Sequence, residues 1–233
     1  MNLVQSTIKR PQVNFYLRPI VRTVVSVDLG FSRDHTAITV LEDREYQTTF
    51  DPVAYGMQWE RKITVRYLER LPLGTYYTDV ARRVAEVEDL VTDCGMFQNN
   101  GGWPCPGVPR PSAVVVDATG VGMPVVELLK QEGLHAPVVP VLITGGDVPT
   151  RDKDGWRVPK KDLVSNFQIL LELKTLKFPG SIPEARMLIK EMQEMRVKVS
   201  AAGNEQFGCW REGEHDDLVL AVGLGAWFLS KVR

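Results

Sequence analysis

The first clear hydrophobic pattern in the chain is an apolar run over residues 21–29 (VRTVVSVDL). A run this rich in valine is typical of a buried strand. Asp28 stands at its end, and a glycine follows shortly after it. Residues 36–41 (TAITVL) form a second β-rich run, and alternating apolar positions predict a third strand over 61–68, after a loop at 51–58. The opening of the chain therefore predicts a strand, an acid, a glycine turn and two more strands.

The remaining periodicities alternate between helix and strand. They predict strands over 113–117 and 138–143 and helices over 75–91, 124–132, 161–173, 183–197 and 216–229. Pro140 lies within the fifth strand, which suggests an edge strand or a bulge there. Residues 144–159 are polar and glycine-rich and read as a loop.

This order of elements predicts an α/β fold. Three strands, a helix, a strand, a helix and a strand fit a ribonuclease H-like mixed sheet, in which three antiparallel strands are followed by parallel strands and helices flank the sheet. The order lacks the regular alternation of a dinucleotide-binding fold.

The length of 233 residues suits one such domain. We expect residues 1–20 to be a linker or flexible arm and residues 21–233 to form a single ribonuclease H-like domain. A stretch at about 93–112 is crowded with Gly, Pro and Asn, which predicts a long surface loop.

Composition excludes several classes of protein. No apolar run is long enough to span a bilayer, and no signal-peptide pattern opens the chain. The three cysteines lack a CxxC spacing, so we expect reduced thiols and no zinc site. The 28 basic and 29 acidic residues leave a net charge of −1, which is not the strongly basic balance usual for a nucleic-acid-binding domain. An acidic metal site would offset basic residues elsewhere.

Three acidic positions point to a metal site. Asp28 and Asp117 end two predicted strands that could be neighbours, and Asp216 and Asp217 begin an apolar helix. Mg²⁺ and Mn²⁺ prefer carboxylate oxygens, and a carboxylate buried at a strand end is costly without a compensating cation or hydrogen bonds. Either acid of the helix could instead serve only as a cap in the helix dipole.

Four segments in this order resemble the nuclease domain of the large terminase subunit of tailed bacteriophages. They are VSVDLGFSRDHTAITVLE, VVVDATGVGMPVVELL, RVPKKDLV and GEHDDLVLAVGLGAW, and the resemblance spans residues 21–229. It implies a ribonuclease H-like fold, close to Holliday-junction resolvases. It also implies cutting of double-stranded concatemeric viral DNA, with little sequence specificity, using two divalent cations, Mg²⁺ or Mn²⁺.

The resemblance assigns roles to individual acids. Asp28, Asp117 and an acid of the HDDL motif would be the metal-binding and catalytic triad. We favour Asp217 for the third position, because related sequences often keep only the acid directly before the apolar run, and keep Asp216 as the alternative. Asp34, six residues past Asp28, is a possible auxiliary ligand or an ordinary loop aspartate.

Partners also follow from the resemblance. It implies a packaging ATPase domain, the small terminase subunit and the portal as partners, together with double-stranded DNA. It also implies that the protein acts in the cytoplasm of the infected bacterial host and not at a membrane. The sequence has no GxxxxGK[ST] phosphate-binding loop, so no ATPase motif is present. We therefore expect either the nuclease half of a larger terminase or a stand-alone relative.

Basic residues near the predicted site are candidate DNA contacts, since Lys and Arg position DNA through its phosphates. They are Lys161, Lys160, Arg157, Lys153 and Arg151, with Lys161 preferred because it opens a helix in the RVPKKDLV motif. A solvated loop would explain the same charges. His215 is a candidate donor to a metal ligand or a neighbour of the helix cap.

Other readings of these motifs remain open. An actin-like ATPase shares the Asp-x-Gly turn of the first strand, but it needs two related domains and gives the HDD motif no role. A Holliday-junction resolvase differs mainly in substrate geometry. A degenerate nuclease that only docks on DNA or portal would not need all three acids. Calcium binding at 152–155 (DKDG) lacks the closing glutamate of a calcium loop.

Overall fold

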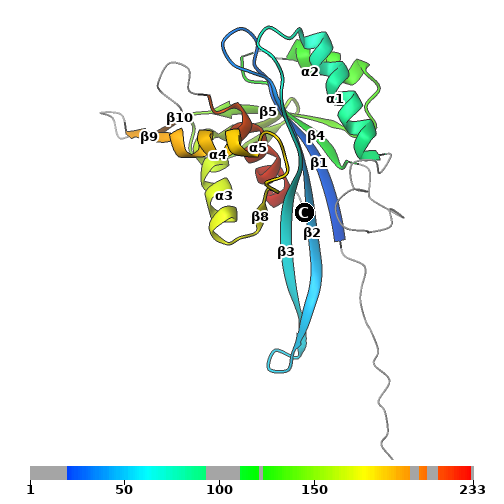
Figure 1. Ribbon diagram of the computed structural model, residues 1–233, viewed down its shortest axis with the longest axis vertical. Coiled ribbons are helices and arrows are strands. Elements are labelled where there is room, and N and C mark those ends of the chain that lie inside the picture. Colours follow the sequence, from blue (N-terminus) through cyan, green and yellow to red (C-terminus); the bar gives the residue numbers. More distant parts are fainter. Residues whose placement is uncertain (1–19, 93–110, 121–122, 200–204, 209–214, 232–233) are drawn as a thin grey trace, which may run out of the picture.

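The computed structural model describes residues 20–92, 111–120, 123–199, 205–208 and 215–231 (Figure 1). The predicted arm at 1–20 lies, except for Ile20, outside the described residues, and so does most of the predicted loop at 93–112. None of the helices in the described ranges combines the length and the apolar character that crossing a membrane requires.

An eight-stranded mixed sheet forms the centre of the fold. Its spatial order is β6-β7-β5-β4-β1-β2-β3-β8. The strands are β1 (Ile20–Asp28), β2 (Ala37–Asp51), β3 (Gly56–Arg70), β4 (Ala113–Asp117), β5 (Val138–Thr144), β6 (Thr150–Asp152), β7 (Gly155–Pro159) and β8 (Leu176–Lys177). The first three are antiparallel, whereas β1, β4, β5 and β7 run parallel to one another. This matches the predicted succession of antiparallel and parallel strands.

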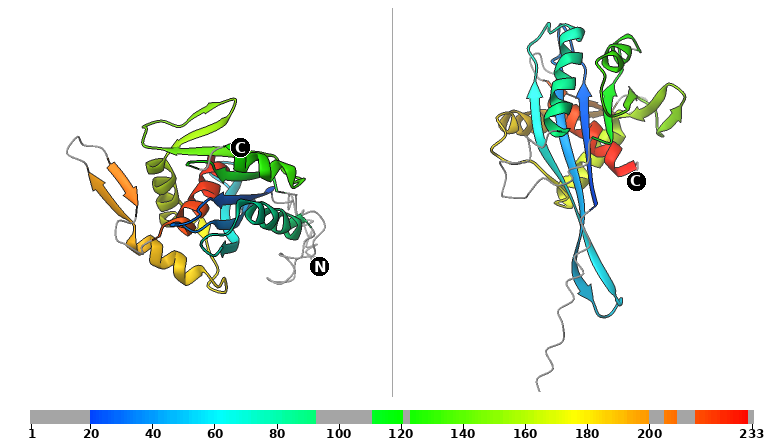
Figure 2. Two further views of the ribbon diagram at one scale, coloured as in Figure 1. Left: turned by 90° about the horizontal axis from the view of Figure 1, so that it is seen from above. Right: turned by 90° about the vertical axis from the view of Figure 1, so that its right-hand side faces the viewer.

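In the described part of the chain, five helices cover the two faces of the sheet (Figures 1 and 2). They are α1 (Tyr77–Thr92), α2 (Met123–Gln131), α3 (Lys160–Glu172), α4 (Ala185–Glu194) and α5 (Asp217–Lys231). The buried side chains divide into two clusters, one with α3, α4 and α5 and one with α1 and α2. The core therefore has two halves, separated by the sheet.

The alternation of side chains along each strand creates this division. Val24 of β1 lies in the cluster of α5, whereas Val25 and Val27 lie in the cluster of α1 and α2. In β4, Val115 faces α5 and Val114 faces the other side. Both faces of these strands are buried, which explains why they read as continuous apolar runs.

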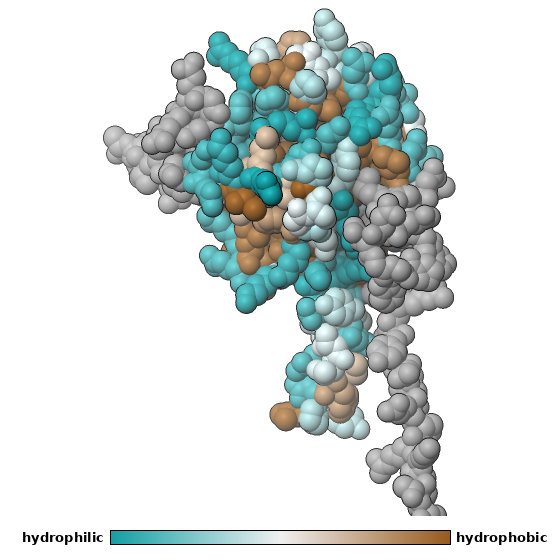
Figure 3. Space-filling model, in the orientation of Figure 1, coloured by the Kyte–Doolittle hydropathy of each residue, from teal (hydrophilic) through white to brown (hydrophobic). Residues whose placement is uncertain are grey.

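Strands β2 and β3 are much longer than the sequence pattern predicted. The predicted loop at 51–58 is limited to a turn at 52–55, because β2 continues to Asp51 and β3 begins at Gly56. The added parts of both strands are rich in polar residues, so the sequence shows no apolar alternation that would predict them. Asp43 is fully buried but pairs with Arg22 on β1 and Arg61 on β3, so charged residues stabilise the sheet here. The resulting hairpin projects from the body, and large apolar side chains are exposed near its tip (Figure 3).

Two other expectations need correction. β5 is an internal strand, paired with both β4 and β7, so it is not an edge. It tolerates Pro140 because β7 pairs only from Val141 onward. The predicted loop at 144–159 contains the β6–β7 hairpin, and the sequence pattern also did not reveal the hairpin of β9 (Arg196–Val199) and β10 (Glu205–Gly208).

The last helix, α5, is buried from Asp217 to Leu229 and packs on β1, β2 and α3. A glycine permits the closest approach. A Cβ on Gly225 would come within 2.4 Å of both Leu41 Cδ1 and Ser26 Oγ. Ser26 in turn donates a hydrogen bond to the carbonyl of Ala221 at 2.8 Å. The helix start, with its acids, is thus held firmly against the sheet.

Candidate metal centre

Asp28 and Asp117 end neighbouring parallel strands. Val27 pairs with Val116 in the sheet, so the following aspartates leave β1 and β4 side by side at one edge. Both residues are buried, at 7% and 8% exposure, and the interaction between the two side chains shifts the pKa of each. The sheet register alone brings these two predicted ligands together.

The start of α5 adds two more acids to this pair. Burial raises the pKa of Asp28 well above its usual range, and the negative charges of Asp117, Asp217 and Asp216 raise it further. Burial also raises the pKa of Asp117, although hydrogen bonds from Thr119 oppose that shift. The backbone N–H of Thr119 donates to Asp117 Oδ1 at 2.8 Å. Four carboxylates therefore interact within one buried region.

Asp34 reaches the same region through a tight loop after β1. Thr36 closes the loop, because its hydroxyl donates to the Gly30 carbonyl and accepts from the Gly30 N–H, both at 3.1 Å. A Cβ on Gly30 would lie 2.2 Å from the Asp34 carbonyl oxygen. Only glycine allows the loop to fold back this closely, which explains the glycine in the first motif.

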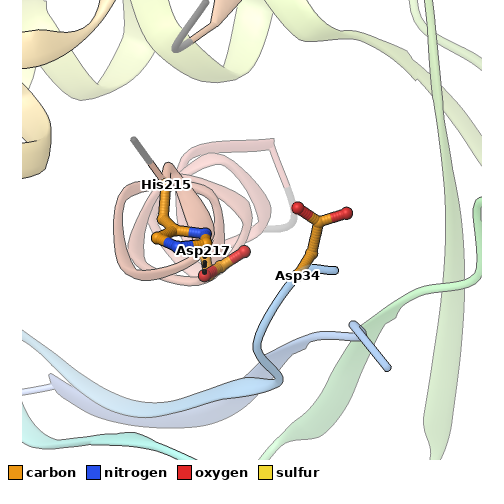
Figure 4. Close-up of side chains that lie close together, drawn as sticks. All are labelled: Asp34, His215 and Asp217. Atoms are coloured by element: carbon orange, nitrogen blue, oxygen red, sulfur yellow. Dashed lines mark ion pairs between the residues drawn. The ribbon is translucent and has the colours of Figure 1, made fainter. Parts of the chain in front are cut away.

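Asp34, His215 and Asp217 form a compact group of potential metal ligands. One ligand atom of each lies within 4.8 Å of the others. Figure 4 shows Asp34 on the loop after β1 and the other two side chains at the start of α5. Asp34 is exposed, His215 is half-buried and Asp217 is buried. Asp217 thus belongs both to this group and to the cluster around Asp28.

Lys160 is the basic side chain closest to these acids in the described contacts. It follows β7 directly, at the edge of the sheet where the parallel strands end, and its Nζ lies 2.7 Å from Asp216 Oδ2. Its charge also lowers the pKa of Asp117 against the effect of burial. Sequence reasoning had favoured Lys161, but Lys161 Nζ pairs with the exposed carboxylate of Asp147 at 2.6 Å.

The other basic candidates lie on the β6–β7 hairpin and pair locally. Arg157 Nε lies 3.1 Å from Asp152 Oδ2, and the Arg151 guanidinium lies 5.3 Å from the centre of the Trp156 ring. Lys153 is exposed in the turn between the two strands. No contact among the described residues links these three side chains to the acids, and their DNA-binding role stays a prediction.

Two charged residues that sequence reasoning missed support Asp217. Arg70, at the end of β3, pairs with Glu191 of α4, and its Nη2 lies 3.6 Å from Asp217 Oδ2. Burial raises the pKa of Asp217, and the Arg70 charge opposes that rise. Glu191 Oε2 accepts the backbone N–H groups of Leu218 and Val219 at 2.9 and 3.1 Å. The one sequence signal for Glu191 was an acid on the apolar face of a predicted helix.

These residues suit a hard divalent cation. Asp217 Oδ2 is buried and accepts no hydrogen bond from any described residue. A buried carboxylate oxygen without a donor is costly, and a cation would satisfy it. Asp28 and Asp117 offer further carboxylate oxygens, the donor type that Mg²⁺ and Mn²⁺ prefer. The donor set therefore fits the expected metals.

No family model matches the sequence, and no curated protein matches it. Solved structures do match. The large terminase nuclease from thermophilic phage G20c is 20% identical, with a TM-score of 0.53, over 94% of this chain and 86% of that chain. The chain has the fold of the large terminase nucleases. The same G20c nuclease with bound magnesium also gives a TM-score of 0.53 at 20% identity, covering 91% of this chain and 83% of that one.

Two further terminases share the fold. The large terminase nuclease domain of Thermus phage P74-26 is 18% identical, with a TM-score of 0.51, covering 88% of this chain and 78% of that chain. The large terminase of bacteriophage HK97 is 14% identical, with a TM-score of 0.50, covering 91% of this chain but 40% of that chain. These are structures of the family that the sequence motifs resemble, and the predicted fold class is confirmed.

Proposed function

We propose that this chain is a metal-dependent endonuclease that cuts double-stranded DNA by hydrolysing phosphodiester bonds. The observation that carries the proposal is the buried carboxylate cluster at the ends of β1 and β4 and the start of α5. The terminase nuclease fold supports it, as does the magnesium bound by the G20c nuclease.

Electrostatics of the cluster support a cation-dependent function. Burial and neighbouring acids raise the pKa of Asp28, so the ionised cluster is unfavourable without added positive charge. Lys160 and Arg70 supply part of that charge, but Arg70 is shared with Glu191. Divalent cations would supply the rest and would allow all the carboxylates to ionise together.

We assign the catalytic and metal-binding roles to Asp28, Asp117 and Asp217. Asp216 is a weaker candidate ligand, because Lys160 already pairs with it. Two Mg²⁺ or Mn²⁺ ions, once bound, would activate a water molecule and stabilise the charge that develops on the scissile phosphate. The protein itself fixes the carboxylates on two strand ends and one helix start and places the Lys160 cation beside them.

The substrate assignment rests on the family resemblance and the fold. We propose concatemeric viral DNA as the substrate during genome packaging in the cytoplasm of the infected host. The packaging ATPase domain, the small terminase subunit and the portal would be its partners. The HK97 large terminase is a longer chain that contains this fold in 40% of its length, which fits a nuclease that works beside a motor domain.

A plasmid cleavage assay tests the proposal. Purified protein is incubated with supercoiled plasmid in Mn²⁺, Mg²⁺, Ca²⁺ or EDTA, and the nicked and linear forms are quantified. We expect nicking and linearisation with Mn²⁺ or Mg²⁺ and none with EDTA. Absence of cutting by the folded protein in Mn²⁺ and Mg²⁺, on plasmid and on a four-way junction, would favour a non-catalytic docking module. Cutting of the junction alone would favour a resolvase.

A further inference from the structure

We propose that an exposed aromatic surface beside the acid cluster stacks on an unpaired base of the DNA, next to the phosphate that is cut. The surface, which we call the aromatic platform, consists of Phe31, Leu73, Tyr76 and Tyr77. The inference rests on the proposed nuclease function and extends it, because it names the DNA structure that the site would prefer, a locally unpaired duplex.

The aromatic platform is apolar and open to solvent. Tyr76 is 68% exposed, and Leu73 and Phe31 are also exposed. The rings of Phe31 and Tyr77 contact each other, with 5.5 Å between their centroids and 35° between their planes. Exposed apolar side chains that gather in one place mark sites of interaction. Aromatic side chains are those on which nucleic-acid bases stack.

The platform lies at the end of the sheet that carries the acids. Phe31 belongs to the loop after β1, which also carries Asp34, and the other three residues lie between the end of β3 and the start of α1. These two loops lie side by side, at the opposite end of the sheet from the tip of the β2–β3 hairpin (Figure 1). Arg70, the last residue of β3, lies 3.6 Å from Asp217. The second loop therefore leaves β3 directly beside the acid cluster.

Hydrogen bonds hold the two loops together. The N–H of Gly74 donates to the carbonyl of Phe31, and the N–H of Leu71 donates to the carbonyl of Thr36, both at 2.8 Å. The Nδ1 atom of His35 is hydrogen-bonded to the carbonyl of Leu71 at 2.8 Å. The platform is thus fixed to the loop that carries an acid, so a base held on it would also fix the position of the neighbouring phosphate.

The charges around the platform suit a polyanion. Arg33 is exposed two residues after Phe31 and forms no ion pair with another described residue. Asp79, in the first turn of α1, is paired with Arg82 at 3.0 Å, so its charge is compensated. Asp34 belongs to the group of potential metal ligands. Arg33 would therefore contact a phosphate while the platform contacts the base.

The depth of the acids favours distorted DNA. Asp28 and Asp117 are almost fully buried, so a phosphate has to approach the protein closely to reach cations bound there. Unstacking a base lets the backbone leave the regular path of a duplex, at a cost that is smallest where the base is mismatched. Stacking on the platform would offset that cost. Because every base has an aromatic face, it would add little sequence specificity.

Binding to paired and mismatched DNA tests the proposal. Fluorescence anisotropy in Ca²⁺ gives the dissociation constants for a duplex and for the same duplex with a short mismatched stretch. We expect the wild-type protein to bind the mismatched duplex at least about fivefold more tightly. Tyr76→Ala and Phe31→Leu should remove this preference, whereas Tyr76→Phe keeps the ring and should retain it. Tyr55→Ala, at the hairpin tip and 86% exposed, is the matched control and should bind like the wild-type protein.

The salt dependence of binding tests the part played by Arg33. Arg33→Ala should weaken binding to both DNAs to a similar extent and lower the slope of log K against log salt by about one. Lys62→Ala, an exposed cation on β3, is the control and should leave the slope unchanged. Equal slopes for Arg33→Ala and the wild-type protein would contradict a phosphate contact beside the platform.

Several outcomes would overturn the inference in proteins that circular dichroism shows to be folded. Equal binding of both DNAs by the wild-type protein is the first, and it would favour a protein partner for the platform. Loss of the preference in Tyr76→Phe or Tyr55→Ala, or its retention in Tyr76→Ala or Phe31→Leu, is the second. Plasmid nicking by a wild-type protein without the preference would refute this inference alone. A preference that depends on Tyr76, in a protein that does not nick plasmid, would refute the proposed nuclease function alone.

Discussion

Glu191 Oε2 accepts a hydrogen bond from the backbone N–H of Leu218 at 2.9 Å, so a side chain of α4 caps the start of α5. The carboxylate is almost fully buried and also pairs with Arg70. A negative charge at a helix N-terminus is favourable, and here it fixes the turn that carries Asp217.

Removing this cap should destabilise the protein strongly. Glu191→Ala removes the closer of the two carboxylates that pair with Arg70 and leaves two helix N–H groups without their acceptor, so we expect a loss of about 3–5 kcal/mol in unfolding free energy. Urea denaturation measures it. Glu194→Ala on the same helix is the control, because Glu194 pairs with the exposed Lys190 at 3.6 Å and should cost no more than about 0.5 kcal/mol. Similar losses for both variants would contradict the capping role.

Two glycines of α5 should respond in opposite ways to alanine. A Cβ at Gly225 would collide with Leu41 and Ser26, so Gly225→Ala should cost about 1–3 kcal/mol. A Cβ at Gly223 meets Leu163 only at 3.8 Å, an ordinary contact, and alanine is the better helix former. Gly223→Ala should therefore be neutral or stabilising by up to about 1 kcal/mol. Thermal unfolding of both variants tests the pair, and an equal effect would refute the close packing of α5.

The raised pKa of Asp28 predicts a pH-dependent stability in EDTA. A raised folded-state pKa gives stability that is fully present below the ordinary value of 3.8 and is lost as the pH rises through the raised value. Asp28→Asn cannot ionise and escapes this loss. We expect the stability of the variant to increase relative to that of the wild-type protein as the pH rises above 3.8.

Asp51 provides the control of opposite sign. Backbone hydrogen bonds from Ala54 and Val53 lower its pKa, so its contribution is present above 3.8 and is lost on acidification. Asp51→Asn should therefore lose stability relative to the wild-type protein as the pH rises. Melting temperatures across the pH range distinguish the two variants. A constant difference between Asp28→Asn and the wild-type protein would show that Asp28 ionises normally.

Adjacent lysines should differ in their effect on cleavage. Lys160 pairs with Asp216 within the acid cluster, whereas Lys161 pairs with exposed Asp147. We expect Lys160→Ala to slow plasmid nicking by about tenfold, equivalent to about 1.4 kcal/mol, and Lys161→Ala by less than about threefold. Single-turnover nicking rates at saturating Mn²⁺ provide the measurement. A larger effect at Lys161 would restore the role that the sequence motif suggested for it.

The sequence predicted those parts of the fold that local patterns determine. Strand β4 was predicted at its observed bounds, because AVVVD is an uninterrupted buried run ending in an acid. The long hairpin was missed because Asp43 and its neighbours look like loop residues. The arginine partners of Asp43 lie on β1 and β3, and a cross-strand ion pair leaves no signal in a local window.

The prediction of site residues was limited in the same way, because residues that act through long-range pairs leave no signal in a local stretch of sequence. Asp28, Asp117 and Asp217 each end a strand or begin a helix, so their motifs could be read directly. Arg70 and Glu191 act through pairing between β3, α4 and α5, which only the tertiary structure reveals. The choice between Lys160 and Lys161 depended on the exact residue at which α3 begins, and sequence patterns fix helix ends poorly.

The central claim is that the carboxylates at the strand ends hold the cations that cut DNA, and comparing Asp117→Asn with Asp152→Asn tests it most directly. Asp152 lies exposed on β6, paired with Arg157, and serves as a matched surface control. Both variants are incubated with supercoiled plasmid in Mn²⁺, and circular dichroism monitors folding. We expect Asp117→Asn to lose at least about 100-fold in nicking rate while folded, and Asp152→Asn to cut like the wild-type protein. Wild-type cutting by folded Asp117→Asn would contradict the site.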